Sequence, residues 1–462
     1  MNHNLFALLR TRFPEKPGAL FIWTPNGRSI PYSKIDELTA RYAGALRQLG
    51  LTRGERLVAL VDKSPEAIIL YLAVLRLGAI LVPLNVAYTV REFRFFLEDT
   101  RPKIVILQPD SNSEYQRVAE EQGAQIETLD TNNGGTLPEL AATTGLFDEV
   151  AITDKNGVAA ILYTSGTTGQ PKGAMLTHGN LSSNACVLHR AWGFTPGDIL
   201  LHALPVFHVH GLFVAVHCAM LNGSPMIYLQ KFDPSQVTEQ LDRATVMMGV
   251  PTFYSRLLEC ESFTRESCRN IRLFISGSAP LLPQTWKTFR NRTGHAILER
   301  YGMSEAGMIT SNPLDGERVP GSVGFALPEI EVQIRDAGGN SLPRGKTGVL
   351  ELRGPNVFKG YWGKPETTAA VVREDGFFIS GDLASMDEDG YITIVDRKKD
   401  MILTAGYNVY PAEIERVIAT YPDVAMVAVG RQPDEMKGET AKAYVVLKKG
   451  TSGNEESIVS HC

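Results

Sequence analysis

The sequence has few cysteines, no closely spaced cysteine pair and no excess of basic charge. Five cysteines occur among 462 residues, at wide spacings and without a Cys-x-x-Cys pair. This pattern favours reduced thiols in a reducing compartment over a disulfide framework. The 46 basic and 51 acidic side chains give a formal net charge of −5, which argues against a general nucleic-acid or anionic-membrane binder.

The chain also lacks a signal-like leader and an uninterrupted membrane-spanning run. Residues 1–14 have neither the continuous apolar stretch nor the small-residue cleavage site of a signal peptide, so we expect a cytoplasmic protein. Residues 199–230 contain no Asp, Glu, Lys or Arg and are long enough to raise the question of a membrane span. Four histidines, Pro205 and Gly211 interrupt this stretch. It therefore predicts a strand, a helix and a second strand of a buried α/β core.

Apolar periodicity predicts alternating helices and strands in the first part of the chain, which is typical of parallel sheets covered by helices. Residues 110–157 are polar, and we expect them to form a surface excursion. The predicted helices are 33–49 and 65–77, and the predicted strands are 57–61, 80–82, 103–107 and 158–163.

Beyond residue 316 the pattern changes to short strands between turn residues, which predicts a β-rich subdomain. The charged run 396–400 lies between two predicted strands and is a candidate hinge, and Pro411 opens a predicted helix. The fold expected is α/β. A large N-terminal domain, 1–396, has two α/β subdomains and the β-rich subdomain, and a small α+β C-terminal lobe, 397–462, follows. The expected short strands are 332–336, 348–353, 376–380, 390–395, 424–429 and 441–447.

A glycine- and hydroxyl-rich segment, 163–173, directly follows the predicted strand 158–163. Glycines let backbone N–H groups turn toward an anion, hydroxyls add donors, and a lysine supplies a point charge for phosphate oxygens. The order differs from a Walker A motif, and composition alone would favour a surface turn. The residues concerned are Thr164, Ser165, Gly166, Thr167, Thr168, Gly169 and Lys172.

Five further motifs accompany this loop in a definite order. They are Ser-Gly-Ser-Ala-Pro at 276–280, Tyr-Gly-Met-Ser-Glu at 301–305, Ser-Gly-Asp at 380–382, Asp-Arg-Lys-Lys-Asp at 396–400 and Gly-Tyr-Asn-Val-Tyr-Pro at 406–411. Over nearly the whole chain, their order and spacing resemble the adenylate-forming superfamily of acyl-CoA synthetases, luciferases and peptide-synthetase adenylation domains. Several stretches, including Glu-Arg-Tyr-Gly-Met at 299–303 and Gly-Pro-Asn-Val-Phe-Lys-Gly-Tyr-Trp at 354–362, resemble malonyl-CoA synthetases in particular.

The resemblance implies that Mg²⁺ is a cofactor and that ATP and coenzyme A are cosubstrates. It makes Glu305 the magnesium carboxylate, assisted by Thr164, and a hard cation bridging phosphate oxygens and one carboxylate is sound chemistry. Asp382 would accept the ribose hydroxyls, Arg397 would reach the ribose and phosphate, and Lys399 would be the hinge. Without the resemblance, the run around Arg397 would be read as a solvated charged turn. Further nucleotide contacts implied are Ser278, Ala279, Pro280, Glu299, Arg300, Tyr301, Gly302, Met303 and Ser304.

The acid pocket is expected around His208 and Arg256. The resemblance places His208 as a gate between the acyl pocket and the coenzyme A channel, and a packed core histidine is the alternative that suits His210. An arginine on the pocket helix would pair bidentately with a distal carboxylate, which favours malonate or methylmalonate. Arg256 could equally point to solvent from the same helix. Ser278, Met303 and Met308 are expected to complete the pocket.

The family's adenylation lysine, in a Pro-x-x-x-x-Gly-Lys context, is not found in the sequence. The last residues, with Asn454 as a good N-cap, predict a starting helix, and we expect the chain to be truncated in its C-terminal lobe. Weak adenylation with ATP binding largely retained follows from that expectation. The alternatives are a short- or medium-chain fatty acyl-CoA ligase, an adenylation domain serving a carrier protein, and a catalytically impaired nucleotide-binding chain.

Overall fold

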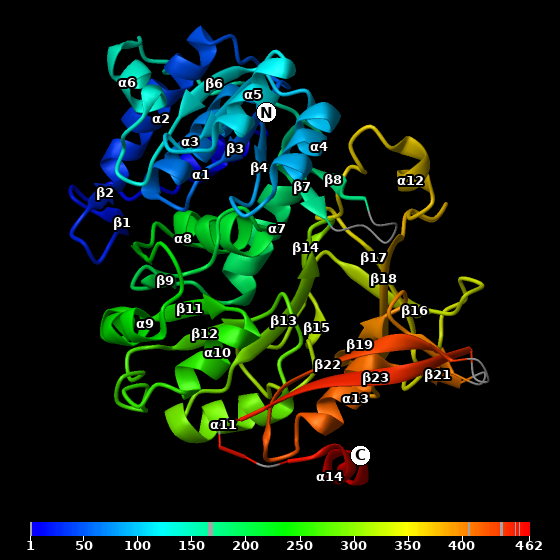
Figure 1. Cartoon of the computed structure of the whole chain (residues 1–462). Coiled ribbons are helices and arrows are strands. Elements are labelled where there is room, and N and C mark those ends of the chain that lie inside the picture. The colour runs from blue at the N-terminus through cyan, green and yellow to red at the C-terminus, as the bar shows by residue number, and fades with distance from the viewer. Residues whose placement is uncertain (1, 165–169, 405–406, 435–437, 449, 452) are drawn as a thin grey trace.

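The computed structural model describes residues 2–164, 170–404, 407–434, 438–448, 450–451 and 453–462. Two α/β sheets with their helices make up most of the chain, and a third sheet and a small C-terminal sheet lie beside them (Figure 1). This is the α/β architecture expected, with a large N-terminal part and a small C-terminal lobe. None of the helices in the described part of the chain is long and apolar enough to cross a membrane.

The first sheet has six strands in the order β6-β5-β3-β4-β7-β8, all parallel except for the last. Its central strands are buried apolar runs, because helices lie against them. Its strands are β3 (Arg56–Leu60), β4 (Ile80–Pro83), β5 (Ile104–Leu107), β6 (Gln125–Thr128), β7 (Val158–Thr164) and β8 (Lys172–Thr177), and its helices are α2 (Tyr32–Gln48), α3 (Pro65–Leu77), α4 (Val90–Thr100), α5 (Ser113–Glu121) and α6 (Thr136–Thr143).

Residues 110–157 are more ordered than a surface excursion, so that expectation was wrong. They contain α5, β6 and α6, and Ile126 of β6 pairs in parallel with Val105 of β5. The sequence pattern did not predict this strand, because β6 is an edge strand without a fully buried residue. A half-exposed edge strand of four residues carries little hydrophobic signal.

The second sheet has nine strands in the order β15-β14-β13-β12-β11-β9-β10-β1-β2. The charge-free stretch 199–230 forms β9, a π-helical turn, α8 and β10, which confirms the prediction of a buried strand, helix and strand. Its strands are β1 (Leu20–Trp23), β2 (Ser29–Pro31), β9 (Leu200–His202), β10 (Met226–Tyr228), β11 (Val246–Gly249), β12 (Leu273–Ser276), β13 (Leu298–Met303), β14 (Gly307–Ser311) and β15 (Phe325–Ala326). The associated helical segments are α1 (Leu5–Arg10), α7 (His178–Ala191), η1 (His210–Ala215), α8 (Val216–Asn222), α9 (Pro234–Gln240), η2 (Leu241–Arg243), α10 (Pro251–Leu258) and α11 (Pro283–Thr293).

The third and fourth sheets are antiparallel, and they contain the short strands predicted beyond residue 316. The third ends at Arg397 and the fourth begins at Ile402, so Lys399 lies in the connection between them. The third sheet comprises β16 (Glu331–Arg335), β17 (Gly348–Arg353), β18 (Phe378–Met386) and β19 (Ile392–Arg397), with α12 (Pro365–Ala369) nearby in the chain. The fourth comprises β20 (Ile402–Thr404), β21 (Tyr407–Val409), β22 (Val424–Asp434) and β23 (Gly438–Leu447), with helices α13 (Pro411–Ile418) and α14 (Glu455–His461).

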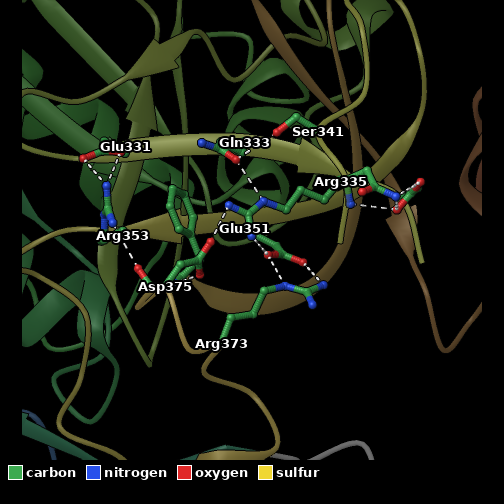
Figure 2. A network of polar contacts seen from close by, with 11 residues as sticks. Glu331, Gln333, Arg335, Ser341, Glu351, Arg353, Arg373 and Asp375 are labelled. Carbon is green, nitrogen blue, oxygen red and sulfur yellow. Dashed lines mark hydrogen bonds and ion pairs between the residues drawn. The ribbon is translucent and has the colours of Figure 1, made fainter. Parts of the chain in front are cut away.

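A buried carboxylate organises the third sheet. Glu351 on β17 is fully buried and lies between two arginines (Figure 2). Arg373 makes two hydrogen bonds to its two oxygens, and Arg335 approaches to 3.3 Å. Arg335 also contacts Asp375 at 2.8 Å. The network therefore ties the loop 371–377 to the sheet by charge-assisted bonds, which are the stronger kind.

We expect Glu351→Ala to destabilise the protein by about 3–5 kcal/mol, because it leaves two guanidinium groups without their buried counter-charge. Chemical denaturation followed by tryptophan fluorescence measures the change. The matched control is Glu331→Ala, since Glu331 pairs with Arg353 at the surface and its loss should cost less than about 1 kcal/mol. Equal effects of the two substitutions would contradict the prediction.

Candidate active site

The carboxylate of Glu305 lies where the two α/β sheets meet. It follows β13 of the nine-stranded sheet, and Thr164, at the end of β7, comes from the six-stranded sheet. The Thr164 hydroxyl lies 3.5 Å from Glu305 Oε1, and Tyr361 donates to the same oxygen at 3.0 Å. Glu305 is 6% exposed, and burial raises the pKa of its carboxyl. A cation at this carboxylate would offset that burial.

Lys172 opens β8 and faces the same group of residues. Its ammonium lies 5.2 Å from the centroid of the Tyr361 ring, and Tyr361 in turn contacts Glu305. The phosphate-loop residues predicted between them, Ser165, Gly166, Thr167, Thr168 and Gly169, fall outside the described residues, so their role stays a prediction. The two described ends of the loop, Thr164 and Lys172, pair with each other across β7 and β8.

A second acidic group, Asp382, lies between Tyr301 and Arg397. The Tyr301 hydroxyl donates to Asp382 Oδ2, and Arg397 Nε is 3.7 Å from Asp382 Oδ1. Asp382 and Arg397 are opposite each other on β18 and β19. Burial raises the pKa of Asp382, whereas Tyr301 and Arg397 lower it. The structure therefore brings Asp382 and Arg397, the two residues expected near the ribose, together with Tyr301, a further predicted nucleotide contact.

The remaining predicted nucleotide residues lie just after β12 and along β13. Ser278 has a φ of 72°, a left-handed conformation, and is exposed beside Ala279 and Pro280. Glu299 accepts a hydrogen bond from the Gly321 amide at 3.0 Å, and burial raises its pKa to about 8. Gly302, Met303 and Ser304 are partly buried at the end of β13 and in the turn after it.

Arg300 is a buried arginine on β13. It is 3% exposed, and its Nε and Nη2 have no hydrogen-bond partner among the described residues. The Nε2 atom of His210 is likewise unpaired in that part of the chain, while its Nδ1 lies 3.3 Å from the Ser278 hydroxyl. A Cβ on Gly277 would come within 2.5 Å of the Arg300 guanidinium carbon. Burial lowers the pKa of both Arg300 and His210, and the arginine charge lowers that of His210 further.

Arg256 lies elsewhere on the surface of the molecule. It is exposed on α10, and its guanidinium stacks over Phe232 with 5.0 Å to the ring centroid. This placement corresponds to the solvent-facing alternative for that residue, not to a pocket wall. His208 is exposed and lies against Phe207, whereas Met308 is fully buried on β14.

Sequence reasoning missed Lys63, which has no motif around it. The buried Lys63 ammonium contacts the carbonyl oxygen and Nδ1 of His202 at 2.9 and 2.8 Å, and it lies 4.3 Å from the ring centroid of Tyr228. His202 Nε2 is 2.9 Å from the Gly211 carbonyl oxygen, so it donates there when Nδ1 accepts from the lysine. Burial lowers the pKa of Lys63 well below its usual value. These contacts anchor the turn that carries His208 and His210.

The chain has clear relatives among known protein families. Residues 9–362 match the family described as AMP-binding enzyme, and residues 413–462 match the AMP-binding enzyme C-terminal domain. The chain belongs to the AMP-binding enzyme family. Within it, the chain groups with the AMP-forming acyl-CoA ligases, enzymes that use ATP and coenzyme A.

Individual relatives place this AMP-binding enzyme close to malonyl-CoA synthetases. The crystal structure of ATP-bound MatB from Rhodopseudomonas palustris superimposes with a TM-score of 0.97 at 47% identity and covers 100% of this chain and 92% of that one. The mitochondrial malonate–CoA ligase ACSF3 of Mus musculus is 35% identical over 88% of this chain and 75% of its own length. A long-chain-fatty-acid–CoA ligase of Bacillus subtilis is 32% identical over 97% and 85%.

Proposed function

We propose that this AMP-binding enzyme is a malonate–CoA ligase in which Arg300 and His210 hold the distal carboxylate of the acid. The observation that carries the proposal is the buried Arg300 guanidinium, whose Nε and Nη2 are unpaired in the described part of the chain beside the equally unpaired His210 Nε2. A desolvated charge without a partner is costly. A carboxylate ligand supplies the missing charge and two acceptor oxygens that match the guanidinium fork. In this proposal Arg300 takes the role expected of Arg256.

The nucleotide end of the site suits ATP with one divalent cation. Mg²⁺ takes oxygen ligands and typically binds through one or two carboxylates together with substrate phosphates. Glu305 offers a buried carboxylate with the Thr164 hydroxyl beside it, so these residues fit the ion and would hold it. The ion would supply charge stabilisation at the phosphates. Asp382 would accept the ribose hydroxyls, while Lys172 and the phosphate loop would bind the triphosphate.

The proposed reaction has two steps. One carboxylate of malonate attacks the α-phosphorus of ATP and releases pyrophosphate, which leaves malonyl-adenylate. The thiol of coenzyme A then attacks the acyl carbon, forms the thioester, and releases AMP and a proton. Arg300 and His210 orient the acid, Lys172 binds phosphate charge, and Lys399 is the proposed pivot of the small lobe.

The structure superimposes better on ATP-bound MatB than on apo MatB, with TM-scores of 0.97 and 0.89.

The test is ATP–pyrophosphate exchange with malonate, methylmalonate, acetate and octanoate, together with thioester formation from each supplied acyl-adenylate. We expect malonate to be preferred over acetate by about 10- to 150-fold, because a charge-assisted contact contributes roughly 1.5–3 kcal/mol. The second assay bypasses adenylation, so it tests the preference for the acid independently of the rate of adenylate formation. A preference for octanoate in both assays would favour a fatty acyl-CoA ligase, the activity of the Bacillus subtilis relative.

A further inference from the structure

Tyr361 lies between the carboxylate and the lysine that the nucleotide site needs. Its hydroxyl donates to Glu305 Oε1 at 3.0 Å, and the centroid of its ring lies 5.2 Å from the Lys172 ammonium. The side chain is 7% exposed and packs edge-on against Phe358, with ring centroids 4.9 Å apart. One buried ring therefore contacts both charged groups.

The backbone around Tyr361 is held from two sides. The Phe358 amide donates to the carbonyl oxygen of Glu305 at 2.7 Å. Residues 359–362 pair with β8: Met175 donates to the Gly360 carbonyl at 2.9 Å, and Trp362 donates to the Gly173 carbonyl at 2.7 Å. The segment thus joins the strand that starts with Lys172 to the turn that carries Glu305. Few alternative positions remain for a ring fixed in this way.

We infer that Tyr361 is a positioning residue: its hydroxyl orients the Glu305 carboxylate toward the divalent cation, and its ring holds Lys172 toward the triphosphate. The inference rests on the proposed function, which makes Glu305 the metal carboxylate. Tyr361 and Thr164 both approach Oε1, and these contacts set the rotation of the carboxylate while its other lone pairs stay open to a cation. Hydrogen-bond partners of a metal ligand commonly contribute to metal affinity in this way. The lysine is held by cation–π attraction.

The two contacts can be separated by substitution. Tyr361→Phe removes the hydroxyl and keeps the ring, whereas Tyr361→Leu removes both. With α,β-methylene-ATP bound and Mn²⁺ as the probe, free Mn²⁺ measured by electron paramagnetic resonance gives the metal Kd. We expect Tyr361→Phe to raise that Kd by about 10-fold, while the nucleotide Kd in EDTA stays within about twofold, since the cation–π contact is kept. Tyr361→Leu should also weaken metal-free nucleotide binding, by about two- to fivefold.

The control is Tyr391→Phe, because the Tyr391 hydroxyl donates to the Glu317 carbonyl and should affect neither Kd. Glu305→Gln serves as the reference for the metal assignment. If Glu305→Gln weakens Mn²⁺ binding and Tyr361→Phe does not, the inference is wrong and the proposed function stands. If Glu305→Gln has no effect, the metal assignment itself fails. Equal weakening of metal and metal-free nucleotide binding by Tyr361→Phe would indicate a purely structural role and overturn the inference.

Discussion

Glu305→Gln lowers the rate of adenylate formation by about 100- to 1,000-fold, the loss typical when one preorganised electrostatic contact to a transition state is removed. The substitution keeps the size of the side chain and its hydrogen-bonding oxygen, so Tyr361 and Thr164 retain a partner. What disappears is the negative charge that the proposed Mg²⁺ needs at this position. The effect should therefore be on metal use and not on folding.

Pyrophosphate release in a single turnover, measured over a series of Mg²⁺ concentrations, checks this expectation. The half-saturating Mg²⁺ concentration should rise together with the loss of rate. Because burial raises the pKa of Glu305, replacing it by a neutral amide should not lower the thermal midpoint. The matched control is Glu331→Gln at the surface of the third sheet, which should leave rate and metal dependence unchanged. An unaltered Mg²⁺ requirement in Glu305→Gln would contradict the assignment.

Arg300→Met removes the preference for a dicarboxylic acid. The expected fall in kcat/KM is about 10- to 150-fold for malonate. For isovalerate, in which an isopropyl group replaces the distal carboxylate, kcat/KM should stay the same or rise. Methionine fills much of the same space without a charge, and replacing a buried charge by an apolar side chain is often neutral or stabilising. The unliganded variant should therefore melt at the same temperature or higher.

The informative comparison is with Arg256→Met. Arg256 is exposed and stacks on Phe232, so its loss should change the malonate-to-isovalerate ratio by less than about twofold, as expected for a surface substitution. The malonate-to-isovalerate ratio of each variant is measured by thioester formation from the supplied adenylates and by pyrophosphate exchange. If Arg256→Met loses the preference for malonate and Arg300→Met retains it, Arg256 binds the distal carboxylate and the assignment to Arg300 is wrong.

Much of the fold could be predicted because its signals are local. Buried parallel strands appear as apolar runs, as in β3 and β5, and a proline marks a helix start, as at Pro411 of α13. The prediction failed at β6, where pairing with β5 supplies the stability and the four residues carry no apolar run. Edge strands depend on their neighbours, which a local pattern does not contain.

The sequence by itself determined the family, the order of the motifs and the identity of the groups expected at the nucleotide, since these depend on residue types at fixed spacings. Only the tertiary structure decided which arginine is buried with guanidinium nitrogens that have no hydrogen-bond partner among the described residues. Arg300 lies on a strand between other strands of the sheet, where its side chain is enclosed, whereas Arg256 lies on the outer face of a helix. Tyr361 and Glu305 are 56 positions apart in the chain and meet only because the 359–362 segment pairs with β8. Contacts between distant segments arise from packing, and no local spacing encodes them.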